Sequence, residues 1–91
     1  MNYWTAGLGK LRANSSHIVQ YERLRSGHFY ADFRRDKRLY PEVYHCIIQR
    51  EGSTEIISWS QHRDLDRARV AAQIELKRLV DGETLRTRTQ A

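Results

Sequence analysis

Cysteine and proline are almost missing from this sequence, which holds one of each, Cys46 and Pro41. A single cysteine excludes an internal disulfide, and chains without disulfides are typical of reducing compartments. No stretch approaches the roughly 18 consecutive apolar residues of a membrane-spanning helix. Residues 1–16 carry two basic side chains but no compact apolar run, so they do not resemble a secretion signal. We therefore expect a cytoplasmic protein that does not contact membranes.

Metal-binding patterns are also missing. No two histidines of the chain stand within four positions of each other, whereas structural zinc sites normally use two such close pairs of ligands. Cys46 follows a histidine directly, but neighbouring residues on a strand point to opposite faces, so these two side chains cannot share an ion. The sequence predicts no metal site and no cofactor. The histidines are His17, His28, His45 and His62.

Catalytic motifs are absent as well. The sequence contains no phosphate-binding loop, no dinucleotide fingerprint and no nucleophile elbow of the G-x-S-x-G type. Ser16 stands beside His17, but adjacency in sequence does not create the geometry of a catalytic triad. Cys46 falls in a pattern typical of buried strand residues, where a thiol has a raised pKa and reacts poorly. We expect a protein that is not an enzyme.

The charge that is present is mainly positive. Lysine and arginine number 16 against 11 acidic residues, which gives a net charge of +5 at pH 7. The excess lies in residues 1–63 and 83–91, whereas residues 64–82 are neutral. This distribution favours an anionic partner. A role in solubility explains the same excess, so both interpretations stay open.

Alternating patterns predict a sheet in the first two thirds of the chain. Residues 28–35 alternate most clearly, with apolar side chains on one face and polar ones on the other. Three more segments are rich in β-branched and aromatic residues: 17–24, 43–50 and 54–60. Turn signals at Gly27 and Gly52 separate successive strands, which favours an antiparallel meander.

The spacing of apolar residues predicts a helix over residues 64–81. Asp64 is a suitable N-cap, because its carboxylate can accept a hydrogen bond from the first turn, and Asp66 suits the positive helix end. An apolar stripe follows the spacing of one helix face: Leu65, Ala68, Ala72, Leu76 and Leu79. Gly82 is expected to end the helix.

We therefore expect an α+β fold, in which an antiparallel meander of three to four strands packs on one C-terminal helix. The compact domain would span residues 17–82, preceded by a flexible arm at 1–16 and followed by a flexible basic tail at 83–91. The predicted core combines inward strand residues with the helix stripe: Phe29, Ala31, Phe33, Tyr44, Cys46, Ile48, Ile57, Trp59, Leu65, Ala68, Ala72, Leu76 and Leu79.

A basic cluster lies at the end of the second expected strand and in the connection after it. Such a cluster can contact several phosphates and release counterions from a nucleic acid, and nearby tyrosines can stack on bases. Exposed arginines also shield sheet edges, and Asp32, Asp36 and Glu42 dilute the positive field. The predicted nucleic-acid site is Arg34, Arg35, Lys37, Arg38, Tyr30 and Tyr40.

A second candidate surface lies on the helix. Val70 and Ile74 stand one turn apart, opposite the apolar stripe. They favour contact with a protein partner, with a second copy of the chain, or with the arm around Tyr3 and Trp4. Single exposed apolar residues are also common without a function. The alternative hypothesis is a protein-interaction or self-associating module, and a structural domain with no tight ligand is a third.

The order strand, turn, strand, helix from Pro41 to Gly82, with residues 29–35 in front, resembles the β-β-β-α half of double-stranded-RNA-binding domains. The Ala-Ala…Leu…Leu stripe of the helix is similar to the last helix of that family. The order also resembles the three-stranded DNA-binding arms of phage-type integrases. The resemblance implies contact with nucleic acid. The chain departs from the RNA-binding family at the helix start, where Asp64 and Asp66 replace lysines, and in having a strand before the hairpin instead of a helix.

Overall fold

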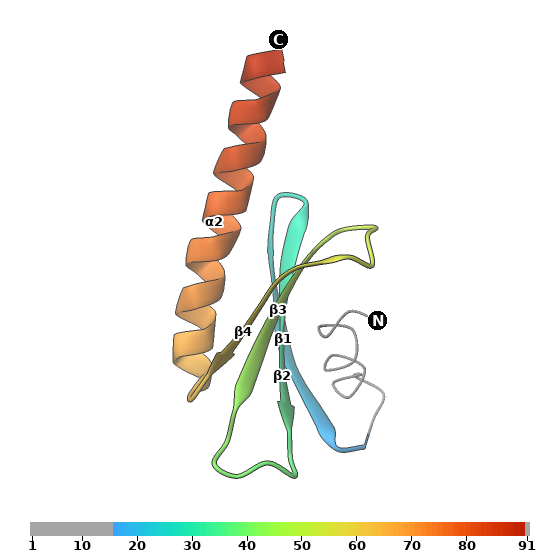
Figure 1. Ribbon diagram of the computed structural model, residues 1–91, viewed down its shortest axis with the longest axis vertical. Helices are drawn as coiled ribbons and strands as arrows, with labels where there is room; N and C mark the ends of the chain where they lie inside the picture. Colours follow the sequence, from blue (N-terminus) through green and yellow to red (C-terminus); the bar gives the residue numbers. More distant parts are fainter. Residues whose placement is uncertain (1–15, 91) are drawn as a thin grey trace.

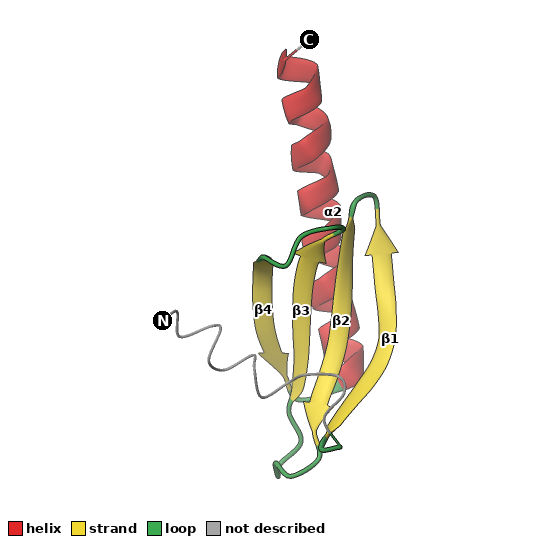
Figure 2. Ribbon diagram, turned by 90° about the vertical axis from the view of Figure 1, so that its right-hand side faces the viewer, coloured by secondary structure: helices red, strands yellow, loops and turns green. Residues whose placement is uncertain are grey.

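The computed structural model describes residues 16–90, with side chains for residues 16–85. The described elements are β1 (Ile18–Ser26), β2 (Phe29–Asp36), β3 (Tyr44–Arg50), β4 (Ile56–His62) and α2 (Leu65–Gln90). Each strand pairs antiparallel with the next in the order β1-β2-β3-β4, and α2 crosses one face of this sheet (Figure 1, Figure 2). The fold is α+β, as predicted. Residues 1–15, including Tyr3 and Trp4, lie outside the described part of the chain.

A two-residue turn, Gly27 and His28, joins β1 to β2. Gly27 has a φ of 57°, and no non-glycine residue of the described chain has a positive φ. A positive φ at the first turn position alone is the type II′ pattern, which suits the twist of a hairpin. A Cβ atom at Gly27 would also lie only 3.1 Å from Cγ2 of Val80 on α2. Glycine is therefore required here both for the backbone conformation and for the approach of the helix.

The registers of β1 and β2 shift between Gln20 and Arg23, which marks a β-bulge. Tyr21 and Glu22 occupy an interval that Phe33 alone fills on β2. Tyr21 packs against the core, and Glu22 accepts a hydrogen bond from the Arg69 side chain on α2. The bulge thus gives β1 two consecutive residues that contact the helix side of the sheet.

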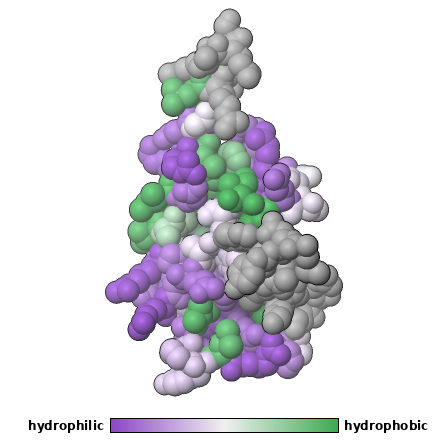
Figure 3. All heavy atoms as spheres, in the orientation of Figure 1, coloured by the Kyte–Doolittle hydropathy of each residue, from purple (hydrophilic) through white to green (hydrophobic). Residues whose placement is uncertain are grey.

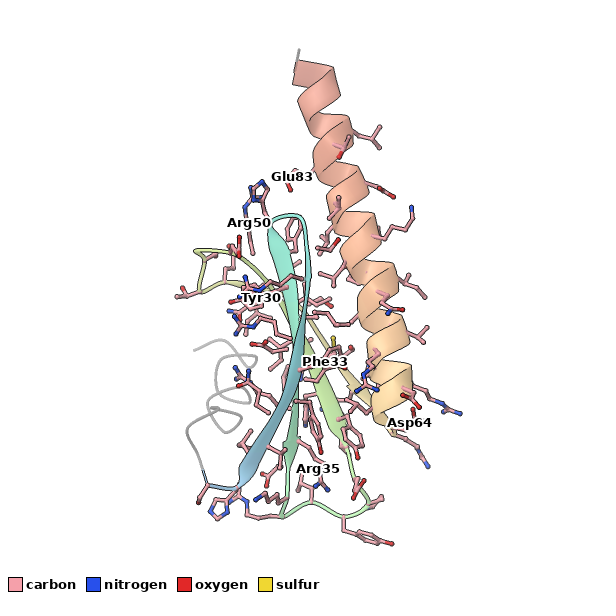
Figure 4. The ribbon with its side chains drawn as sticks, turned by 180° about the vertical axis from the view of Figure 1, so that it is seen from behind. Tyr30, Phe33, Arg35, Arg50, Asp64 and Glu83 are labelled. Atoms are coloured by element: carbon pink, nitrogen blue, oxygen red, sulfur yellow. The ribbon has the colours of Figure 1, made fainter. Side chains whose placement is uncertain are left out.

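The core lies between the sheet and α2. Its buried members are Phe29, Ala31, Phe33, Cys46, Ile48, Ala68, Ala72 and Leu76, with Tyr44, Leu65 and Leu79 packed at its border. Phe33 points from the sheet toward α2 (Figure 4) and is fully buried. Ala68 and Ala72 face the sheet and are small enough to let the helix lie close to it. These predicted core residues are confirmed.

The prediction that Ile57 and Trp59 on β4 belong to the core beneath α2 is wrong. Ser58 and Ser60 pair with Ile48 and Cys46, so the serines face the helix and Trp59 faces the other side, next to Ile47. Ile57 falls at a register shift of β4 and is 41% exposed. The pairing with β3 fixes which side chains of this edge strand face the core, and it overrides their size.

The predicted helix end at Gly82 is also wrong. The backbone of α2 continues through Gly82 to Gln90, and Gly82 lacks the positive φ that a glycine cap would need. The hydroxyl of Thr84 donates a hydrogen bond to the carbonyl of Val80 at 3.0 Å, within the helix. A glycine in a helix interior costs only about 1 kcal/mol relative to alanine, so it need not stop a helix. The C-terminal part of α2 extends past the end of the sheet (Figure 1).

Candidate functional site

The predicted basic cluster does not form a single surface. Arg34 and Arg35 are neighbours on β2, so they point to opposite faces of the sheet: Arg34 lies on the outer face and Arg35 on the face covered by α2. Lys37 and Arg38 follow in the loop between β2 and β3. The predicted site is therefore divided among three environments.

Arg35 is engaged inside the fold. Its Nε donates a hydrogen bond to the hydroxyl of Tyr21 at 3.2 Å, and its Nη1 lies 2.9 Å from Oε1 of Glu42. The guanidinium also lies 5.9 Å from the centroid of the Tyr44 ring. The hydrogen bond to Tyr21 and the charge of Glu42 raise the pKa of Arg35 above its usual value. Arg35 thus ties the loop to β1 and β3 and is a poor candidate for binding a ligand.

Arg34 and Tyr30 belong to a network on the outer face of the sheet (Figure 4 labels Tyr30). At its centre is Asp32, which is only 1% exposed. Arg23 lies 2.6 Å from one carboxylate oxygen of Asp32, and Arg34 lies 3.4 Å from the other. The Arg23 guanidinium lies 4.2 Å from the centroid of the Tyr30 ring, whose hydroxyl donates to Gln49. Arg23 and Arg34 thus both form ion pairs with the buried carboxylate of Asp32.

The outer face also carries a small apolar cluster. Ile18 and Ile47 are buried there, packed with Ile56 and Trp59. Nε1 of Trp59 donates a hydrogen bond to Nδ1 of His45 at 3.0 Å, and burial lowers the pKa of His45. A neutral imidazole is the form that can accept this bond.

The loop at residues 37–43 carries the three predicted site residues that do lie together. Tyr40 is 95% exposed, and the side chains of Lys37 and Arg38 are exposed beside it in sequence. Arg38 donates from Nε and Nη2 to the two carboxylate oxygens of Asp36, at 3.0 and 2.7 Å. These bonds, with one from the Arg38 backbone, lower the pKa of Asp36 to about 2.

Arg63 lies at the same end of the sheet and was not among the predicted residues. It follows His62, which pairs with Tyr44 at the start of β3, and Tyr44 in turn pairs with Arg35. Neighbouring strands are about 4.8 Å apart, so the ends of β2 and β4 are about 10 Å apart. The loop and the junction between β4 and α2 lie together at this end of the molecule (Figure 1). The register could have revealed this proximity, but a linear scan for charge clusters could not.

We call the surface formed by Lys37, Arg38, Tyr40 and Arg63 the loop-end surface. Within the described residues, neither the Lys37 ammonium nor the Arg63 guanidinium has a hydrogen bond or an ion pair. Asp64, next to Arg63, accepts a hydrogen bond from the backbone of Arg67 at 2.7 Å, which confirms its predicted role as N-cap. The loop-end surface thus combines an exposed aromatic ring with two uncompensated cations.

The second predicted surface is exposed on α2. Val70 is 55% exposed and Ile74 is 66% exposed. With Ala71 they border a shallow hollow that Asp66 and Arg67 close at one end. Figure 3 shows hydrophobic side chains at the surface on the side of the molecule where α2 runs.

Within residues 16–90, the structure brings no three potential metal ligands together, and no helix there has the length and apolar character to cross a membrane. Cys46 is 1% exposed, and burial raises the pKa of its thiol to about 11. No family model matches the chain, and the searches of curated proteins and of solved structures also give no significant match.

Proposed function

We propose that this chain is a small, non-enzymatic, cytoplasmic module that binds nucleic acid through the loop-end surface. The observation that carries the proposal is the position of Tyr40, a 95% exposed aromatic ring in a loop with Lys37 and Arg38. An exposed ring can stack on a base while adjacent cations contact phosphates. At 95% exposure both faces of the Tyr40 ring are open to solvent, so the ring is available for stacking on a ligand.

The cations support contact with a phosphate backbone. The uncompensated charges of Lys37 and Arg63 attract anions. Arg38 uses Nε and one Nη2 hydrogen on Asp36, so the hydrogens of Nη1 still point outward. Because Asp36 fixes the plane of the guanidinium, Arg38 loses little side-chain freedom when it binds a phosphate oxygen.

We further propose that the preferred ligand is single-stranded. A base inside a duplex has both faces covered by its neighbours, whereas an unpaired base can accept the ring of Tyr40. Three cations can neutralise only a few phosphates, so we expect weak binding with a modest salt dependence, a slope of about −0.7 per phosphate for single strands.

Fluorescence anisotropy with labelled DNA and RNA oligonucleotides, single-stranded and duplex, at low salt, tests the proposal. The variant Lys37→Gln/Arg63→Gln should bind more weakly, because it removes two charges that pair with no residue in the described part of the chain. Its matched control is Arg25→Gln/Arg50→Gln, which removes two exposed charges that pair with Glu51 and Glu83 at the opposite end of the sheet. Tyr40→Ala should weaken binding by about 1–3 kcal/mol, and Tyr40→Phe should retain it.

The two double variants separate local contact from general attraction. Weaker binding by Lys37→Gln/Arg63→Gln alone supports contact through the loop-end surface. Equal losses in both would attribute binding to net charge, and the absence of any signal at low salt would reject the proposal. A protein-interaction role is the second candidate, favoured by the exposure of Val70 and Ile74.

A further inference from the structure

Ile18 and Ile47 lie on the outer face of the sheet, opposite α2, and yet both are buried. Their exposures are 7% and 3%, similar to those of the core residues beneath the helix. In Figure 2, α2 lies behind the sheet, and within residues 16–90 no helix or strand crosses the face turned to the viewer. Side chains stand roughly perpendicular to a sheet, so neighbours on one face shield the sides of a side chain and leave its end open. The burial of the two isoleucines therefore requires a cover.

The two isoleucines belong to one apolar cluster, although they are too far apart to touch. Ile18 pairs with Asp36 of β2, whereas Ile47 pairs with Asp32, four residues earlier on the same strand. This offset is about 13 Å along the strands, and β1 and β3 are about 10 Å apart across β2. Apolar side chains from another part of the chain must therefore connect Ile18 with Ile47. The outer-face residues between the two isoleucines are polar: Gln20, Arg34 and His45.

The cover belongs to the same chain, because the isoleucines are buried in a single chain with no second copy beside it. Beyond the described side chains, the sequence leaves residues 1–15 and 86–91. The backbone of residues 86–90 continues α2 past the end of the sheet (Figure 1). Residues 1–15, in contrast, join the sheet directly before β1, whose first residue is Ile18. Residues 1–15 are thus the segment that is attached beside the cluster.

The length and composition of residues 1–15 suit this position. Fifteen extended residues reach about 50 Å, which is several times the separation of the two isoleucines. Transfer of large apolar side chains from water into an apolar cluster is favourable, so the segment gains stability from docking there. Its large apolar residues are Met1, Tyr3, Trp4, Leu8 and Leu11.

We propose that residues 1–15 fold back across the outer face of the sheet and place their large apolar side chains between Ile18 and Ile47, beside Trp59. The segment then forms a third layer, with the sheet between it and α2. Val70 and Ile74 stay exposed in the same chain, so the segment does not cover the outer side of α2. The inference does not rest on the proposed nucleic-acid function, because the loop-end surface takes no part in this contact.

The fluorescence of Trp59 tests the cover. Trp4→Phe keeps an aromatic ring and leaves Trp59 as the only tryptophan of the sequence. When Leu8→Ser/Leu11→Ser is added, acrylamide should quench Trp59 more strongly and its emission should shift to longer wavelengths, because water reaches the indole. The matched control adds Val70→Ser/Ile74→Ser instead. It removes two exposed apolar side chains from α2 and should leave both readings unchanged.

Nuclear Overhauser effects in the unmodified chain test the contact without any substitution. Protons of the large apolar side chains in residues 1–15 should show effects to the methyl groups of both Ile18 and Ile47. A mixture of isotope-labelled and unlabelled chains shows whether each contact lies within one copy or between two. Contacts within one copy are expected.

Three results would overturn the inference. The first is equal quenching of Trp59 in the Leu8/Leu11 variant and in the Val70/Ile74 control. The second is a set of Overhauser effects that joins residues 1–15 to Val70 and Ile74, or to no part of residues 16–90. The third is contact that occurs only between labelled and unlabelled copies, which would assign the cover to a second chain.

Discussion

Arg23 and Asp32 form a two-point hydrogen-bonded ion pair on the face of the sheet opposite α2. Nε and Nη2 of Arg23 lie 2.6 and 2.9 Å from the two oxygens of Asp32. Asp32 is 1% exposed, whereas the Arg23 side chain retains 36% exposure. The β-bulge in β1 brings Arg23 opposite Asp32, so a local irregularity of the backbone provides the partner for a buried acid.

Arg23→Ala is expected to lower the free energy of unfolding by about 2 kcal/mol at neutral pH. The change leaves the buried Asp32 carboxylate with only the longer contact to Arg34, and loss of hydrogen bonds to a charged group costs about 1.5–3 kcal/mol. Urea denaturation followed by circular dichroism measures the change.

A double-mutant cycle separates this pair from its surroundings. Asp32→Ala alone leaves Arg23 and Arg34 near each other without the acid that pairs with them. In Arg23→Ala/Asp32→Ala both members of the pair are removed, so neither is left without its partner. We expect the double variant to be more stable than the sum of the single losses implies. Strict additivity would show that the two residues act independently.

Gly27→Ala is expected to destabilise the hairpin for two separate reasons. Alanine at a φ of 57° costs about 1–2 kcal/mol, and the new Cβ would press against Val80 at 3.1 Å. Gly52→Ala is the control, because its φ is 79° but nothing lies within 4 Å of a Cβ there. In thermal unfolding, Gly27→Ala should lower the melting temperature more than Gly52→Ala does. The difference between the two variants should shrink when Val80→Ala is added to Gly27→Ala.

Gly82→Ala should instead stabilise the protein, by about 1 kcal/mol. Gly82 lies in the interior of α2, and no atom within 4 Å opposes a methyl group there. Alanine has the higher helix propensity because it loses less backbone entropy on folding. Urea denaturation measures the gain. A loss of stability would mean that the residue has a left-handed conformation and caps a shorter helix.

The strands and the helix start follow from local sequence patterns. Alternation placed Phe29, Ala31 and Phe33 on the core side of β2, and Asp64 marks the helix start because few other side chains can cap the first turn. Such patterns depend on residues close in sequence, so they can be recognised without the three-dimensional structure.

The face that each β4 side chain occupies, and the acids that pair with the arginines, depend on contacts between segments that are distant in sequence. Trp59 faces away from α2 because it pairs with Ile47, and no pattern within β4 itself reveals that register. Arg35 and Arg38 form a cluster in sequence, but Glu42 and Asp36 pair with them in the fold. A charge cluster in sequence therefore predicts a charged surface only after its acids are placed.

His45 should make the stability of the fold depend on pH. Burial lowers its pKa below the ordinary 6.5, although the nearby charge of Asp36 acts in the opposite direction. The unfolded chain therefore binds a proton more readily than the folded one, so stability is complete above about pH 6.5 and falls as the pH drops toward the lower, folded pKa. Protonation also removes the lone pair that accepts the bond from Trp59.

Denaturation curves between neutral and mildly acidic pH should show this loss of stability in the unmodified chain. The variant His45→Gln, which keeps an acceptor but does not titrate, should reduce the loss. A pH profile unchanged by His45→Gln would assign the dependence to other groups.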